Sequence, residues 1–179
     1  AIAKTAGGAA TLTLRADRNI IVSAPISSTS GALGITLSAA NNASAAVGGV
    51  NVGANLTSNG GQILIGGAGG NVTAAQLFGI GYALNASATE AAVKLGTNVT
   101  LSSGGGHITI NGRSNASGGG SYSGVKGGIY ALSGATVDSG GGNIYLSGIS
   151  TGDDKVFGFG LEANAGTTTT FKTSTTSGA

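Results

Sequence analysis

The chain contains no cysteine, methionine or tryptophan, and Pro25 is its only proline. Without cysteine it can form neither disulfides nor thiolate metal sites. With one proline it cannot be a collagen, which needs glycine at every third position and abundant proline. Charged residues make up only 8% of the 179 residues, and the net charge of +2 is scattered, so we expect no nucleic-acid surface. No run of 18 apolar residues occurs, so we expect no membrane-spanning helix.

Aromatic residues are also scarce, at 4%, whereas hydrophobic residues reach 40% and glycine numbers 36. The core must therefore be thin and built from Val, Ile, Leu and Ala, because bulky aromatic side chains normally give a globular core its depth. Such a Gly-rich chain could be disordered, but its regular apolar pairs and mean hydropathy of +0.28 argue against that. The length suits one domain.

A ten-residue pattern, apolar-x-Ser-x-x-Gly-x-apolar-x-apolar, occurs four times. The copies read "ISSTSGALGI" (26–35), "LTSNGGQILI" (56–65), "LSSGGGHITI" (101–110) and "VDSGGGNIYL" (137–146), at uneven intervals of 30, 45 and 36 residues. Serine can hydrogen-bond nearby backbone and glycine can adopt positive φ, so each Ser-x-x-Gly segment predicts a corner between two strands. The predicted corner residues are Ser28, Gly31, Ser58, Gly61, Ser103, Gly106, Ser139 and Gly142.

Further apolar residues extend this register. Even offsets place side chains on one face of a strand, so all of these residues should point inward. The tail "TSTTSGA" suggests a fifth copy, with Gly178 lying 36 residues after Gly142. The apolar pairs that close the copies are Leu33/Ile35, Ile63/Ile65, Ile108/Ile110 and Ile144/Leu146. The residues six places before each copy are Ile20, Val50, Leu95 and Ala131. The residues two places before each copy are Ala24, Ala54, Val99 and Ala135.

These patterns predict an all-β fold. Hairpins could form a β-sandwich, but a register repeated four times favours a parallel β-helix in which equivalent residues such as Ile63, Ile108 and Ile144 stack. Coils of ~20 residues would give about eight or nine coils spanning roughly 40 Å. The stretch "NASATEAAVKL" (85–95) should be a loop entering a strand. We expect residues 1–179 to form one elongated β-helix, cut from a larger protein, with a looser half at 111–179.

The stretch "ATLTLRADRNIIVSAPISSTSGALGITLSA" (10–39), with "TSNGGQILIGG" and "DSGGGNIYLSG", resembles filamentous haemagglutinin-like exoproteins of two-partner secretion systems. The resemblance implies a right-handed parallel β-helix in a bacterial adhesin, secreted or held at the outer-membrane surface. It also implies an outer-membrane transporter as partner of the full-length protein. The Asn-Pro motifs of the family's secretion domain are missing, which points to the shaft or a distal binding region.

We therefore expect a non-enzymatic, monomeric segment that binds a host or bacterial surface protein or glycan, with roles in virulence or biofilms. Two alternatives stay open: a β-helical polysaccharide-processing enzyme, and a purely structural spacer in an autotransporter-like passenger. The enzyme would need two carboxylates brought together across coils, because Asp17, Glu90, Asp138 and Glu162 are isolated in sequence.

The chemistry-bearing residues favour no cofactor and no metal. "GGGHI" (104–108) lacks the Gly-Lys-Ser/Thr of a phosphate loop, and His107 sits at an outward offset of its strand. Asp153 and Asp154 could begin a calcium site, but two adjacent carboxylates are far from the six to eight oxygens that calcium needs. We expect a solvated loop there.

Six Asn-x-Ser/Thr sequons could carry glycans in a secreted protein, although the same residue types also suit plain corners. Aromatic residues concentrate in the C-terminal half, where they could contact a ligand or pack beneath a loop. The sequons are at Asn42, Asn55, Asn71, Asn85, Asn98 and Asn115, and the aromatic residues are Tyr122, Tyr130, Tyr145, Phe157 and Phe159.

Overall fold

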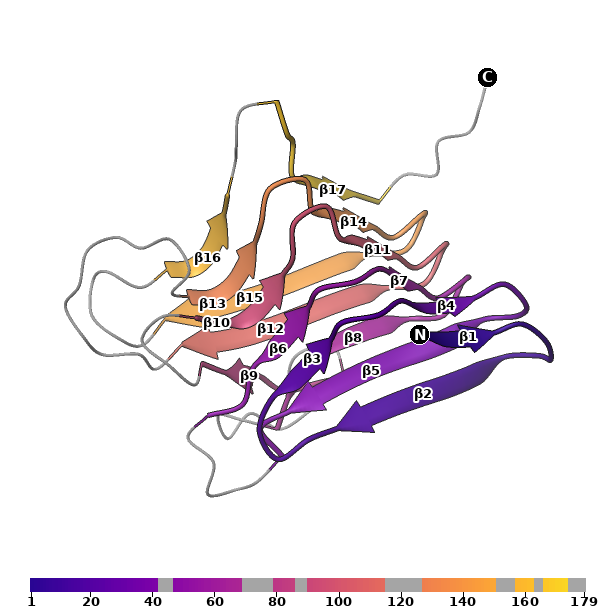
Figure 1. Cartoon of the computed structure of the whole chain (residues 1–179), viewed down its shortest axis with the longest axis horizontal. Helices are drawn as coiled ribbons and strands as arrows, with labels where there is room; N and C mark the ends of the chain where they lie inside the picture. The colour runs from indigo at the N-terminus through magenta and orange to yellow at the C-terminus, as the bar shows by residue number, and fades with distance from the viewer. Residues whose placement is uncertain are drawn as a thin grey trace.

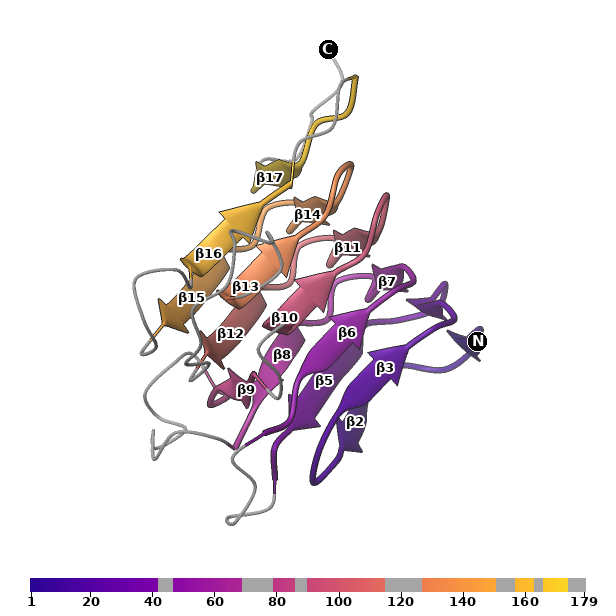
Figure 2. The same cartoon turned by 60° about the vertical axis from the view of Figure 1, so that its left-hand side comes forward.

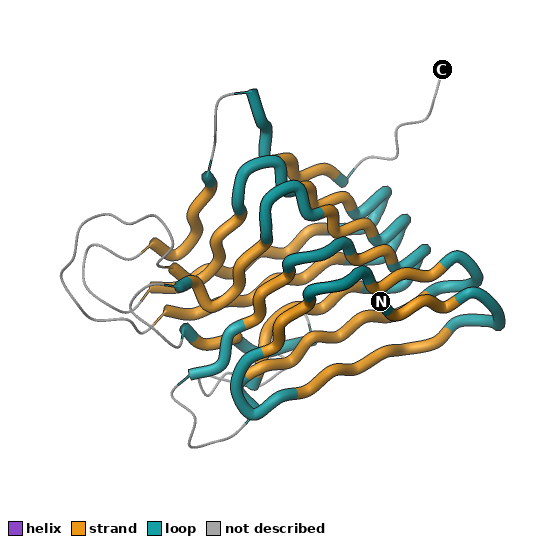
Figure 3. Tube along the Cα trace, in the orientation of Figure 1, coloured by secondary structure: helices purple, strands orange, loops and turns teal. Residues whose placement is uncertain are grey.

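The computed structural model describes residues 1–41, 47–68, 79–85, 90–114, 127–150, 157–162 and 166–173, which form strands and contain no helix (Figures 1 and 3). The strands are β1 (Ile2–Lys4), β2 (Ala10–Arg15), β3 (Ile20–Val22), β4 (Ile26–Ser28), β5 (Leu33–Ala39), β6 (Val50–Val52), β7 (Leu56–Thr57), β8 (Ile63–Gly67), β9 (Ala83–Leu84), β10 (Ala91–Leu95), β11 (Thr100–Ser102), β12 (Ile108–Ser114), β13 (Gly127–Ala131), β14 (Thr136–Asp138), β15 (Ile144–Ser150), β16 (Phe157–Leu161) and β17 (Thr170–Lys172).

The strands form three parallel sheets that the chain visits in a fixed cyclic order. Sheet A runs β1-β4-β7-β11-β14-β17, sheet B runs β2-β5-β8-β12-β15, and sheet C runs β3-β6-β10-β13-β16. Each circuit through A, B and C adds one strand to every sheet, and β9 adds a second, short partner for β12 (Figure 2). The predicted all-β fold with parallel pairing is confirmed.

Alternation of side chains buries one aliphatic row from each sheet. Ile63, Ile108 and Ile144 are paired in register as predicted, and the first two are fully buried. One continuous cluster of Ile, Leu, Val and Ala fills the space between the sheets, with Phe171 packing against it. The narrow interior explains the scarcity of aromatic residues, because a large ring would force the stacked sheets apart.

Two details of the predicted register are wrong by two residues. In the first copy Ile35, not Leu33, pairs with Ile63, because Ile35 lies nine positions after Ile26 whereas Ile63 lies seven positions after Leu56. In the third and fourth copies Val93 and Ile129, not Leu95 and Ala131, take the place of Val50. These copies have two additional residues between sheets C and A. In the third copy the additional residues form a turn, which is closed by a hydrogen bond from the Val99 N–H to the Gly96 carbonyl. A two-residue shift keeps the same face inward, so the inward assignment is unaffected.

The predicted number of coils is also wrong. Sheet A contains six strands, so the stack rises five interstrand steps, about 24 Å, rather than roughly 40 Å. The register in sheet A, from Ile2 through Ile26, Leu56, Leu101 and Val137 to Phe171, shows that one circuit takes 24 to 45 residues. The fifth copy begins at Phe171, which pairs with Val137, two residues earlier than the tail suggested. Gly178 lies outside the described residues.

The extra length of the circuits is concentrated at one corner. The connections from sheet A to sheet B are four or five residues long (29–32, 58–62, 103–107 and 139–143), and the first four from C to A are three or four (23–25, 53–55, 96–99 and 132–135). The connections from sheet B to sheet C instead vary: 16–19, 40–49, 115–126, 151–156, and 68–90 with β9 inside it. We call this third position the BC corner.

Candidate functional site

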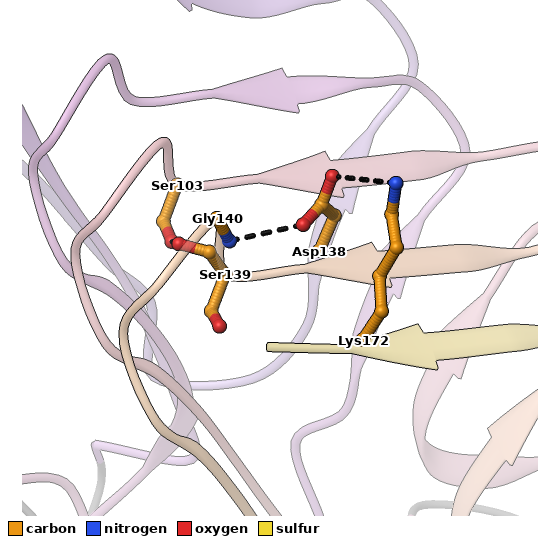
Figure 4. A network of polar contacts seen from close by, with 5 residues as sticks. All are labelled: Ser103, Asp138, Ser139, Gly140 and Lys172. Atoms are coloured by element: carbon orange, nitrogen blue, oxygen red, sulfur yellow. Dashed lines mark hydrogen bonds and ion pairs between the residues drawn. The ribbon is translucent and has the colours of Figure 1, made fainter. Parts of the chain in front are cut away.

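Each predicted corner serine is buried and ties its corner together. The hydroxyl of Ser28 donates to the Gly31 carbonyl at 2.7 Å, and the hydroxyls of Ser103 and Ser139 donate in the same way to Gly106 and Gly142 at 2.5 Å. Ser58 makes the same bond to Gly61. The Ser103 hydroxyl also reaches the Ser139 carbonyl of the next turn at 3.0 Å, and Figure 4 shows these two serines stacked. The bonds run within and between turns, so these serines act in folding.

The corner glycines are required for a reason that the sequence interpretation missed. Only Gly31 has a positive φ, of 67°. A Cβ on Gly106 would lie 2.2 Å from the Gly61 carbonyl oxygen, and one on Gly142 would lie 2.2 Å from that of Gly106. The positive φ values fall on the preceding residues, such as Gly60 and Gly105. Close backbone stacking, rather than φ, therefore excludes a side chain at Gly61, Gly106 and Gly142.

His107 is exposed at this corner, as expected. Its Nδ1 accepts a hydrogen bond from the Asn143 N–H at 2.9 Å, and its ring meets the Tyr145 ring edge-on with centroids 6.0 Å apart. Among the described residues no three His, Cys, Asp or Glu side chains gather where they could hold a metal ion. Asp153 and Asp154 lie outside the described residues.

The C-terminal turns hold an ion pair and several of the aromatic side chains. Lys172 Nζ lies 3.1 Å from Asp138 Oδ2, and the other carboxylate oxygen of Asp138 accepts from the Gly140 N–H (Figure 4). Tyr130 is buried, whereas Phe159 is 38% exposed. Burial, helped by the negative charge of Glu162, raises the pKa of the Tyr130 hydroxyl. Tyr122 and the side chain of Phe157 lie outside the described part.

The described sequon asparagines differ in accessibility. Asn55 and Asn98 are exposed, and the side-chain oxygen of Asn55 accepts from the Thr100 N–H at 2.9 Å. Asn85 is only 4% exposed, and its amide donates to the Ser114 hydroxyl at 3.1 Å. A glycan could therefore not reach Asn85 in the folded chain. Asn42, Asn71 and Asn115 lie outside the described residues.

A polar groove of about 310 Å³ lies on the outer face of sheet B, beside the BC corner. Its floor is made by β2 and β5, and one wall is the segment 79–81. That segment crosses β8 so closely that a Cβ on Gly66 would lie 2.3 Å from the Gly81 carbonyl oxygen. The Asn111 amide donates to the Ile80 carbonyl at 2.7 Å, and the Tyr82 hydroxyl bonds the Ser147 hydroxyl at 2.9 Å. The wall is therefore fixed to β12 and β15.

Arg15 carries the only charge among the groove-lining residues that the structure describes. Its Nε and Nη2 donate to the side-chain oxygen of Asn41 at 3.2 and 2.9 Å, and the Ser38 hydroxyl donates to the same oxygen at 3.1 Å. The Asn41 amide nitrogen donates to the Ala16 carbonyl at 3.0 Å and to the Ser38 carbonyl. Every polar atom of the Asn41 side chain is thus engaged, and Arg15 is held in one orientation.

The sequence interpretation identified neither Arg15 nor Asn41. The signal was present in the alternation of "TLTLR" (11–15), which places Thr13 and Arg15 outward, but the partnership with Asn41 depends on the register between β2 and β5. A second groove of about 90 Å³ lies on sheet C and includes Ile21, Glu90 and Lys94. It is too small for more than a few atoms of a ligand.

No helix among the described residues is long and apolar enough to cross a membrane. Comparisons with protein-family models, with curated proteins and with solved structures found no match.

Proposed function

We propose that the chain is a non-enzymatic segment of a bacterial adhesin, secreted or held at the cell surface, folded as a right-handed parallel β-helix. The cyclic visit to three parallel sheets supports the coiled path. The resemblance of residues 10–39 to filamentous haemagglutinin-like exoproteins supplies the class, and with it an outer-membrane transporter as partner of the full-length protein.

The observation that carries the proposal is the uneven distribution of connection lengths. The connections from A to B and the first four from C to A keep nearly the same length, and the corner between A and B is fixed by serine hydroxyls and close glycine contacts. The BC corner varies from four residues to more than twenty. Surface segments that vary in length on a rigid scaffold are where binding residues concentrate. The BC corner would thus present a row of different segments to a surface protein or glycan.

The test replaces segments of the BC corner and leaves the strands of the three sheets unchanged. Residues 115–126 and 151–156 are replaced by Gly/Ser segments of equal length, and the control replaces residues 163–165, between sheets C and A, in the same way. Binding of the purified chain to epithelial cells, bacterial cells and a glycan array is then measured. The proposal expects binding by the parent and the control and its loss in the exchange. No binding by the parent would favour a spacer, and cleavage of a glycan would favour the enzyme.

The β-helix itself is tested independently. Circular dichroism of the purified chain should show a β spectrum without a helical component. A crystal structure would decide the handedness, and a left-handed path would remove the support that the resemblance lends to the proposal.

A further inference from the structure

The groove on the outer face of sheet B has the chemistry of a site for an acidic sugar. Arg15 projects from β2 and is the one charged side chain, with no acidic one beside it, among the described residues that line the groove. Thr13 and Thr36, which are paired in register on β2 and β5, line the groove together with Ser38. Hydroxyl groups of this kind can donate to and accept from sugar hydroxyls. A volume of about 310 Å³ is at the small end of ligand sites, enough for one or two sugar rings.

The guanidinium group is oriented before any ligand arrives. Because Asn41 occupies the Nε and Nη2 donors on one side, the free edge of the group is the one formed by Nη1 and the second Nη2 proton. Within the described residues no carboxylate forms an ion pair with Arg15. Two parallel N–H donors at fixed spacing match the two oxygens of a carboxylate. Preorientation reduces the entropy lost on binding, which raises affinity without a new contact.

The amide of Asn41 can adopt only one useful orientation. If its oxygen and nitrogen were exchanged, the amide N–H groups would face the guanidinium donors, and the oxygen would face the carbonyls of Ala16 and Ser38. All of these contacts would then be repulsive. Asn41 therefore orients Arg15, and the described part of the chain supplies no counter-ion to it.

We propose that this groove binds a saccharide through a sugar carboxylate, such as that of a hexuronic acid. Arg15 makes a bidentate contact with the carboxylate, Asn41 positions Arg15, and the hydroxyls of Thr13, Thr36 and Ser38 contact the sugar ring. The proposal rests on the proposed binding function and names a ligand class for one part of it. It places a fixed, charged subsite on the scaffold beside the variable BC corner.

The test uses two disaccharides that differ only in the carboxylate. Cellobiouronic acid and neutral cellobiose are titrated into the full chain, with binding followed by calorimetry and saturation-transfer NMR. We expect the acid to bind about 10- to 100-fold more tightly, which is the range for a charge-assisted bidentate contact. Equal binding of the two disaccharides would overturn the proposal, and so would binding of neither. Tighter binding of cellobiose 6-sulfate would overturn the assignment to a carboxylate.

Matched variants distinguish a specific contact with the oriented Arg15 from nonspecific attraction to positive charge. Arg15→Gln should abolish the preference for cellobiouronic acid. Arg15→Lys should also lack this preference, because lysine has no pair of parallel N–H donors. Arg18→Gln removes the same charge from an exposed residue outside the groove and should change the affinity by less than about twofold, because exposed charges are screened. Equal losses in Arg15→Gln and Arg18→Gln would show nonspecific attraction and overturn the proposal.

The two proposals can fail separately. If Arg15→Gln leaves glycan and cell binding intact while the BC-corner exchange removes it, the groove proposal is wrong and the adhesin proposal stands. If the chain binds cellobiouronic acid through Arg15 but adheres to no cell or glycan surface, the groove is a binding site and the adhesin proposal is wrong.

Discussion

Replacing Gly106 by alanine tests whether close stacking of the backbone holds the corner between sheets A and B. A Cβ at this position would lie 2.2 Å from the Gly61 carbonyl oxygen and 2.5 Å from the Gly61 carbonyl carbon. Ordinary contacts between such atoms need about 3.5 Å, so one turn must move by about 1 Å relative to the next. Both contacting atoms belong to backbone that is itself stacked, so no side chain can rotate away.

The expected free-energy change follows from two opposing terms. Alanine at an ordinary φ lowers the entropy of the unfolded chain and stabilises a protein by about 0.4–1 kcal/mol. Overpacking in a dense region costs about 1–3 kcal/mol or more. Because the φ of Gly106 is not positive, the clash is the main unfavourable term. We expect Gly106→Ala to destabilise the fold by about 1–2 kcal/mol.

Gly8 supplies the matched control. It has no positive φ, and a Cβ there would meet nothing within 4 Å. Gly8→Ala should therefore leave stability unchanged or raise it by up to about 1 kcal/mol. Urea unfolding followed by far-ultraviolet circular dichroism gives both changes from the shift in midpoint at constant slope. If Gly106→Ala behaves like Gly8→Ala, the close approach of the turns is refuted.

Three further predictions concern the corner, the core and pH. Ser103→Ala should cost about 1–3 kcal/mol in urea unfolding, because a fully buried hydroxyl that serves the carbonyls of Gly106 and Ser139 is lost; an unchanged midpoint would contradict the bonding. Ile110→Ala should cost about 2–5 kcal/mol and Leu146→Ala less, since Ile110 is fully buried and Leu146 is 38% exposed; equal losses would contradict the placement of the core. Burial raises the pKa of Tyr130 in the folded chain, so the unfolded chain releases this proton first as pH rises. Stability should therefore hold below pH about 10 and fall as the pH rises through the higher folded pKa, and Tyr130→Phe should reduce this fall; identical pH profiles for the parent and the variant would refute the assignment.

The parallel strands could be predicted because their signal is periodic and local. Every copy repeats an inward apolar residue at even spacing, so the faces of β5, β8 and β12 follow from the sequence. The exact pairing partners could not be predicted in the same way, since shifting a strand by two residues keeps the same side chains on the same face. That ambiguity explains why Ile35 pairs with Ile63 in place of Leu33.

The groove could not be predicted, because it depends on long-range register. Arg15 and Asn41 lie 26 residues apart, and they meet only because Arg15 is opposite Ser38 on the next strand. The groove wall at 79–81 also depends on contacts with β12 and β15 that join residues 31 and 65 positions apart in the sequence. A periodic signal defines the scaffold, whereas the groove arises where an irregular segment lies across it.

The two kinds of corner differ in how much sequence change they tolerate. At the corner between sheets A and B, each turn fits the next through a buried serine and a glycine with no room for a Cβ, so almost any change there disturbs its neighbours. At the BC corner the connection lengths differ from turn to turn while the flanking strands keep their pairing. Insertions there add only a slowly growing loop-closure cost. Sequence change at the BC corner therefore alters what the surface presents without altering the stacked strands beneath it, which is what the proposed binding role requires.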